Sequence, residues 1–150
     1  MDGPFLWYLN RGTGLVILAL FTITTVLGVL STGGKAGKRV PSFVTQAVHR
    51  NIALLSVVLL AVHVVTAVAD SFVDIRWWQA VVPWAGSTYQ PLWLGLGTLA
   101  LDLIVVLTVT SLLRTRLSHR LWRAVHLSSY VGWALSVAHG IGIGTDVQAG

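Results

Sequence analysis

Five histidines occur in this chain of 150 residues, and four of them fall in or at the edge of two long apolar stretches. His49 and His63 share one stretch, and His126 and His139 share the other. Ionisable side chains are costly to bury in an apolar span, so they are candidates for function. Because imidazole binds iron, copper, zinc and nickel well, these four side chains could ligate a metal.

The spacing predicts two histidine pairs at different heights. A helix rises by about 21 Å from His49 to His63, which is about four turns, and places both side chains within about 40° of one face. Ser56 lies midway and is expected on the same face. If the two helices run parallel, His49 lies level with His126, which we call the inner pair. His63 then lies level with His139, which we call the outer pair.

Two facing imidazoles are a poor site for a bare zinc ion, which takes four ligands. They complete the axial ligands of a haem, whose porphyrin supplies the other four nitrogens. A haem also needs an apolar slot and cations for its propionates. Arg50 and Arg123 stand near the inner histidines, and Arg11 lies in the outer part of the first apolar stretch. Each arginine has an alternative role in topology or in reaching the membrane surface.

The second histidine pair does not share one face of an ideal helix. The step from His126 to His139 rotates such a helix by about 220°, so the two side chains would point to different sides. Trp133 shares the face of His126, and Gly132 shares that of His139. Either this helix is bent or rewound, or two haems approach it from different directions. Trp133 is a candidate for an aromatic bridge between the haems, with core packing as the alternative.

The elements that must position these residues are membrane-spanning helices. The chain is 55% hydrophobic and 10% charged, whereas soluble domains carry about 25% charged residues. A soluble domain of this size could not bury so much apolar surface, which excludes an ordinary cytosolic enzyme. The absence of cysteine excludes disulfides, thiolate-held iron–sulfur clusters and covalent c-type haem.

Four apolar segments are long enough to cross a membrane, which needs about 20 helical residues. The sequence therefore predicts an all-α integral membrane protein, a four-transmembrane-helix bundle with haem-binding residues inside. The helices are expected at about residues 5–31, 42–69, 92–113 and 118–142, within one domain over 1–142 that is followed by a flexible tail over 143–150.

The basic residues predict the orientation. Eight of the ten lie in or beside the connections after the first and third spans, without an acidic residue: Lys35, Lys38, Arg39, Arg50, Arg114, Arg116, Arg120 and Arg123. By the positive-inside rule these two connections are cytoplasmic, and both termini face outward. The expected location is the bacterial plasma (inner) membrane. The net charge of +5 therefore reports topology, with membrane lipid and no nucleic acid as the expected partner.

The connection over residues 70–90 carries Trp77, Trp78, Trp84 and Tyr89. These aromatics fit a belt at the outer interface, or a lid over something bound at the outer face. Asp102, in the middle of the third span, is either a proton relay or the partner of a ligand's ring N–H. The alternative is a protonated acid that is hydrogen-bonded to a threonine of the first span.

His119 is expected at the interface rather than as a ligand. Several glycines are expected at close-packing positions, with clearance for a haem edge as the alternative. They are Gly12, Gly14, Gly95 and Gly97.

At the histidines the sequence resembles the ferric reductase-like transmembrane family, the two-haem membrane core of NADPH oxidases and ferric reductases. The motif reads H-x(13)-H from His49 to His63 and H-x(12)-H from His126 to His139. The flanks "VHRNIALLSVVLLAVHVVTAV" and "HRLWRAVHLSSYVGWALSVAHGIGIGTD" are similar to actinobacterial members, as is the opening helix "WYLNRGTGLVILALFTITTVLGVLS".

The resemblance implies two bis-histidine b-type haems that carry electrons from the cytoplasm to an external acceptor. No GxGxxG or flavin motif is present, so no flavin or NAD(P) site is expected in this chain. The donor would be a flavoprotein or membrane quinol, and the chain an oxidoreductase subunit acting with partners. The alternative is a non-redox membrane subunit whose histidines bind haem or metal for transport or sensing, or only brace the bundle.

Overall fold

The computed structural model describes residues 4–32, 41–71 and 75–144, and all regular secondary structure in those ranges is helical. The helices are α1 (Pro4–Thr32), α2 (Ser42–Ala69), the short 3₁₀ helix η1 (Trp77–Ala80), α3 (Pro91–Leu112), α4 (His119–Leu127) and α5 (Ser129–Gly144). Of these, α1, α2 and α3 are long and apolar enough to cross a membrane. The expected basic residues Lys35, Lys38 and Arg39 lie outside the described residues.

The helix boundaries follow from local chemistry. Pro41 precedes α2 and Pro91 is the first residue of α3, positions where the missing N–H of proline costs least. At the start of α4, the Ser118 side chain accepts a hydrogen bond of 3.3 Å from the main-chain N–H of Leu121. This cap satisfies one of the free N–H groups of the first turn.

The helix expected over residues 118–142 is divided at Ser128. The main-chain N–H of Ser128 bonds to the Val125 carbonyl at 3.0 Å, three positions back, and its hydroxyl donates to the same carbonyl at 2.7 Å. This tighter turn changes the helical register between His126 and His139, so the rotation of an ideal helix does not apply. Residues 143 and 144 belong to α5, and the rest of the predicted tail lies outside the described residues.

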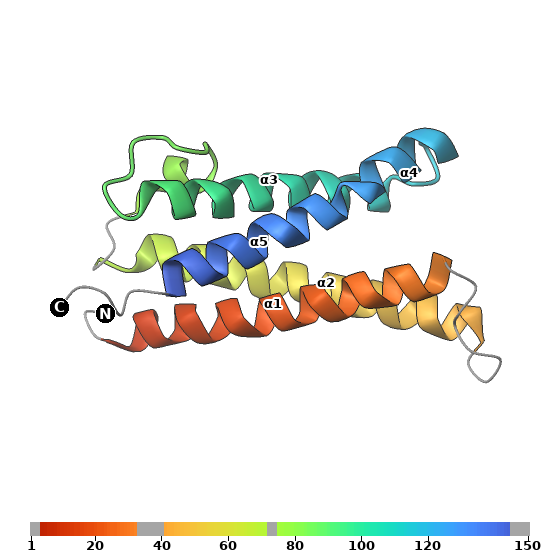
Figure 1. Ribbon diagram of the computed structural model, residues 1–150, viewed down its shortest axis with the longest axis horizontal. Helices are drawn as coiled ribbons and strands as arrows, with labels where there is room; N and C mark the ends of the chain where they lie inside the picture. The colour runs from red at the N-terminus through yellow and green to blue at the C-terminus, as the bar shows by residue number, and fades with distance from the viewer. Residues whose placement is uncertain (1–3, 33–40, 72–74, 145–150) are drawn as a thin grey trace.

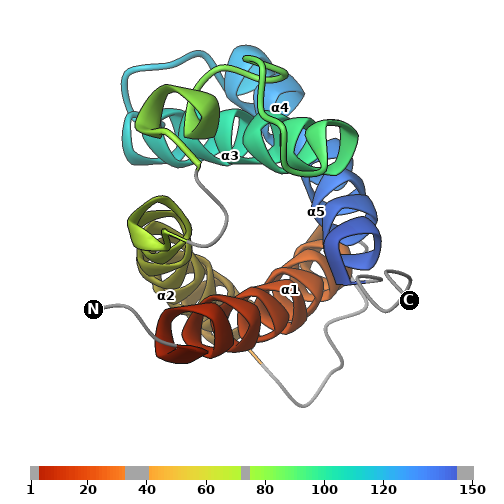
Figure 2. The same cartoon turned by 90° about the vertical axis from the view of Figure 1, so that its left-hand side faces the viewer.

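The helices pack in two antiparallel pairs, α1 with α2 and α3 with α5, and α1 joins the pairs by contacting α5 (Figure 1). Viewed along the bundle, the order around its axis is α2, α1, α5 and α3 (Figure 2). Helices α2 and α5 run in the same direction, as the pairing of histidines by height requires (Figure 1). Helix α4 lies at one end of the bundle, and η1 lies at the other.

Most large apolar side chains lie on the outside of the bundle. Leu15, Val58 and Leu112 are between 61% and 71% exposed, while the buried apolar residues of the described chain include only Ile17, Ile75 and Ala100. In water such a surface would drive association. In a lipid bilayer it is the surface expected of membrane-spanning helices, because the lipid tails are equally apolar.

A side-chain amide joins the first two helices. The Nδ2 group of Asn10 on α1 donates to the His63 carbonyl at 2.8 Å and to the Thr66 hydroxyl at 3.2 Å, both on α2. The same turn of α1 therefore contacts α2 at one of the predicted ligands.

Replacing Asn10 with Leu should lower the free energy of unfolding by about 1 kcal/mol, because two interhelical hydrogen bonds are lost. The measurement is the midpoint of thermal unfolding in detergent. Asn51→Leu is the matched control, since Asn51 is exposed on α2 and its replacement should leave the midpoint unchanged. Equal midpoints for the two variants would contradict the role of Asn10.

Candidate functional site

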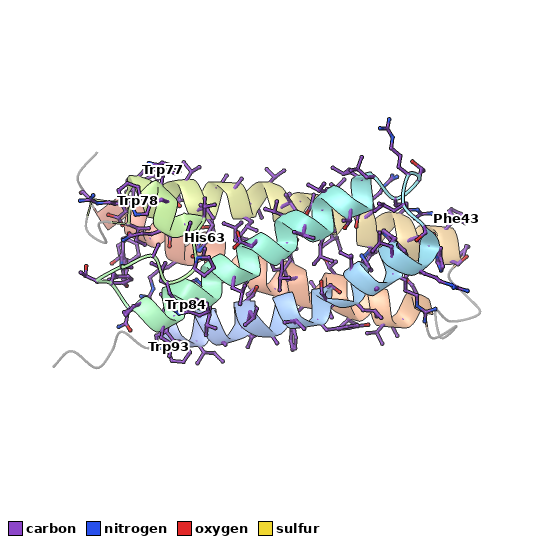
Figure 3. All side chains as sticks on the ribbon, turned by 90° about the horizontal axis from the view of Figure 1, so that it is seen from above. Phe43, His63, Trp77, Trp78, Trp84 and Trp93 are labelled. Atoms are coloured by element: carbon purple, nitrogen blue, oxygen red, sulfur yellow. The ribbon has the colours of Figure 1, made fainter. Side chains whose placement is uncertain are left out.

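The structure brings the four predicted ligands together as two pairs. The rings of His49 on α2 and His126 on α4 have centres 6.2 Å apart and planes inclined by 62°. His63 on α2 and His139 on α5 form the second pair, and the two side chains interact electrostatically. His63 lies between the helices rather than on the outside of the bundle (Figure 3). The two levels are about 21 Å apart by helix rise along α2.

The ring separation in the inner pair fits one metal ion between two imidazoles. A metal–nitrogen bond is about 2 Å long, and each nitrogen lies about 1 Å from its ring centre, so the centres would be about 6 Å apart. The observed 6.2 Å agrees with that spacing. No group of three or more His, Cys, Asp or Glu side chains within the described ranges could hold a metal ion.

Three of the four imidazoles are oriented by a main-chain carbonyl of a neighbouring helix. The Nδ1 atoms of His49, His63 and His139 contact the carbonyl oxygens of Thr24 (3.0 Å), Asn10 (3.0 Å) and Trp93 (2.7 Å), respectively. A carbonyl can only accept, so Nδ1 carries the proton and the Nε2 lone pair is free to bind a metal. Histidines that bind metals are held in the same way. Main-chain oxygens, not Asp102, thus serve these three rings.

A glycine faces each of these three rings. A Cβ at Gly14 would lie 3.1 Å from the His63 ring and one at Gly28 would lie 3.5 Å from the His49 ring. A Cβ at Gly97 would meet the ring of His139.

Each of these glycines lies one helical turn after the carbonyl that its histidine contacts: Gly14 after Asn10, Gly28 after Thr24, and Gly97 after Trp93. In an α-helix the Cβ of a residue leans over the preceding turn. A glycine at this position therefore leaves the carbonyl open to a side chain from another helix. Gly28 was not singled out from the sequence, although its distance from Gly14 along the chain equals that between His49 and His63.

His126 is held differently. Its Nδ1 atom is buried without a hydrogen-bond partner among the described residues. Its ring stacks on that of Trp122, with centres 4.8 Å apart and planes inclined by 19°. Trp122 was not predicted as a site residue, although a position one turn before His126 on a helix lies on the same face.

The predicted arginines occupy different surroundings. Arg11 on α1 lies over the Trp7 ring at 4.7 Å. It donates to the Gly144 carbonyl at the end of α5 at 3.3 Å, at the end of the bundle nearer to His63 and His139. Arg50 on α2 and Arg123 on α4 have exposed side chains.

Between the two levels lie the other predicted site residues. Ser56 is fully enclosed, and its hydroxyl donates to the Ile52 carbonyl at 2.7 Å. The indole Nε1–H of Trp133 donates to the Thr22 hydroxyl on α1 at 3.0 Å. Both side chains are thereby fixed in position by the protein.

The end of the bundle that carries η1 has a pocket of about 280 Å³. Its lining residues are Arg76, Trp78, Gln79, Ala85, Gly86 and Thr88. The Arg76 guanidinium lies 5.1 Å from the centre of the Trp78 ring. Trp84 packs against Gly95 of α3, and Trp77, Trp78 and Trp84 all gather at this end (Figure 3).

In the described residues, the fold and the site together define an all-helical protein with spans suited to a membrane and two pairs of histidines at two heights. A family model described as "Domain of unknown function (DUF8596)" matches residues 5–146, so the chain belongs to that family. The matched region includes all four paired histidines. No curated protein and no solved structure matches the chain.

Replacing Gly97 with Ala should lower the free energy of unfolding by about 1–3 kcal/mol, because the new Cβ overpacks against His139 and displaces it from the Trp93 carbonyl. Thermal unfolding in detergent measures the change. Gly12→Ala is the control, since a Cβ at Gly12 meets nothing within 4 Å and Ala favours a helix by about 1 kcal/mol. If Gly97→Ala is as stable as Gly12→Ala, the close contact does not exist.

Proposed function

We propose that this protein is a two-haem b-type cytochrome that carries electrons across a membrane. The inner pair, His49 and His126, would hold one haem, and the outer pair, His63 and His139, the other. The observation that carries the proposal is the hydrogen bonding of three of these rings through Nδ1, which leaves Nε2 free. The resemblance of the histidine motif to ferric reductase-like membrane domains supports the same assignment.

A haem supplies a one-electron iron couple when it is bound, and the chain's own residues bind and orient it. The four histidines would hold the haem irons, and main-chain carbonyls keep three of the four rings in the tautomer that can ligate. Arg11 would receive the propionates of the outer haem, and Arg50 and Arg123 those of the inner haem. Ser56 and Trp133 would lie between the haems, with Trp133 as the bridging aromatic.

We further propose four spans, with α4 and α5 together forming the fourth. They contain 9 and 16 residues, so neither is long enough to span the membrane alone. Arg114, Arg116, Arg120 and Arg123 lie at the end of the bundle that carries α4. By the positive-inside rule that end faces the cytoplasm of a bacterial plasma membrane, and the inner pair is the cytoplasmic one.

The electron donor in this proposal is a flavoprotein or membrane quinol at the cytoplasmic side. The acceptor is an external redox partner, and the protein is an oxidoreductase subunit that acts with both. The pocket beside Arg76 lies at the outer end, where a cation would favour an anionic acceptor.

The same hydrogen bonds also fit a second, non-redox role. They join α2 to α1 and α5 to α3, so the histidines could brace the bundle without a cofactor. The two roles differ in a simple property, because a bis-histidine haem protein is coloured and a braced bundle is not.

The purified protein should contain two haems per chain, with absorption bands typical of b-type haem. Replacing His63 or His126 with Ala should leave one haem, because each change removes one axial ligand of a different pair. His119→Ala is the control, since His119 is exposed on α4 and its loss should leave both haems. Haem content and the visible spectrum measure these outcomes. A folded, colourless protein after expression with haem supplied would contradict the proposal and favour the bracing role.

A further inference from the structure

The inner pair is surrounded by polar atoms that lack a partner. Three buried side-chain atoms in the described parts of the chain have no hydrogen bond: Nδ1 of His126, Nε1 of Trp122 and Oγ1 of Thr24. Trp122 stacks on His126, and the carbonyl of Thr24 contacts His49. Buried polar groups are nearly always satisfied in native proteins, so an unsatisfied group points to a missing partner. At the outer pair, by contrast, both Nδ1 atoms bond to carbonyls.

The two nitrogen groups belong to rings that stack on each other. The rings of Trp122 and His126 are nearly parallel and have centres 4.8 Å apart. An indole nitrogen can only donate. If His126 ligates through Nε2, its Nδ1 is a donor too, so each of the two stacked rings has an N–H that lacks an acceptor.

The surroundings favour a negatively charged acceptor. The guanidinium of Arg114 lies 5.7 Å from the centre of the Trp122 ring, and the ring of His119 lies 6.0 Å from it. Helix α4 also carries Arg120 and Arg123 and contains no acidic residue. A carboxylate would gain from this field and from charge-assisted hydrogen bonds, which are stronger than neutral ones.

We propose that Trp122 donates its Nε1–H to a carboxylate of the cofactor held by the inner pair, and that one water bridges the same carboxylate to His126 Nδ1–H. This inference rests on the proposed function, because the carboxylate belongs to a haem propionate. It assigns the inner site a cofactor-binding residue outside the histidine motif.

The test compares haem with its dimethyl ester, which lacks the two carboxylates. Both are titrated into the apoprotein in the His63→Ala background, where only the inner pair is complete, and the Soret absorbance gives the affinity. Trp122→Phe keeps an aromatic ring on His126 but removes the N–H. It should weaken haem binding about tenfold, which is about 1.4 kcal/mol, and leave binding of the ester unchanged. Trp84→Phe, at the opposite end of the bundle, is the control and should bind both ligands as the parent does.

Three other results would overturn the inference. If Trp122→Phe binds haem as tightly as the parent, water rather than the cofactor satisfies the indole. If Trp122→Phe weakens the binding of haem and of the ester equally, Trp122 acts through packing alone. If the parent protein, which carries only His63→Ala, binds neither ligand, the proposed function fails as well. This result is distinct from the first two because it is seen without any change at Trp122.

Discussion

The structure depends on how imidazole N–H groups are satisfied inside an apolar bundle. A buried N–H without an acceptor is unfavourable. Three histidines bond instead to carbonyls of a neighbouring helix, each exposed by a glycine one turn later, as with Asn10 and Gly14 for His63. Each of these carbonyls already accepts a hydrogen bond within its own helix. An imidazole from another helix can therefore reach it only where the two helices approach closely. The same contact therefore sets the helix packing, the ring orientation and the free Nε2.

The two histidine levels are built differently as a result. The outer pair is complete within the protein, since His63 and His139 both have carbonyl partners. The inner pair has a carbonyl only for His49, while His126 is held by stacking on Trp122. An imidazole whose N–H donates a hydrogen bond is a more basic ligand than one whose N–H has no acceptor. The two sites are thus chemically distinct.

The sequence predicts much of this arrangement because hydrophobic length and histidine spacing are local properties. Three apolar spans and the approach of His49 to His126 follow from them. The break at Ser128 does not follow from them, because a hydrogen bond between a serine hydroxyl and a carbonyl of the same turn leaves no trace in hydropathy. From the sequence alone, the helix that carries His126 and His139 could be bent, could be rewound, or could be approached by two haems from different directions. Gly28 and Trp122 were not identified because their roles depend on which helix faces which. The haems and the direction of electron flow remain predictions from resemblance.

Electron transfer across a sealed vesicle tests the central claim most directly. The protein is reconstituted into liposomes with ferricyanide trapped inside, and dithionite, which crosses lipid poorly, is added outside. Two haems held at the two histidine levels, about 21 Å apart by helix rise, would bridge most of a hydrocarbon core of about 30 Å. The account predicts rapid reduction of the trapped ferricyanide with the intact protein, and only the slow leak of empty liposomes when His63 is replaced by Ala. Reduction at the leak rate by a protein that carries both haems would contradict it.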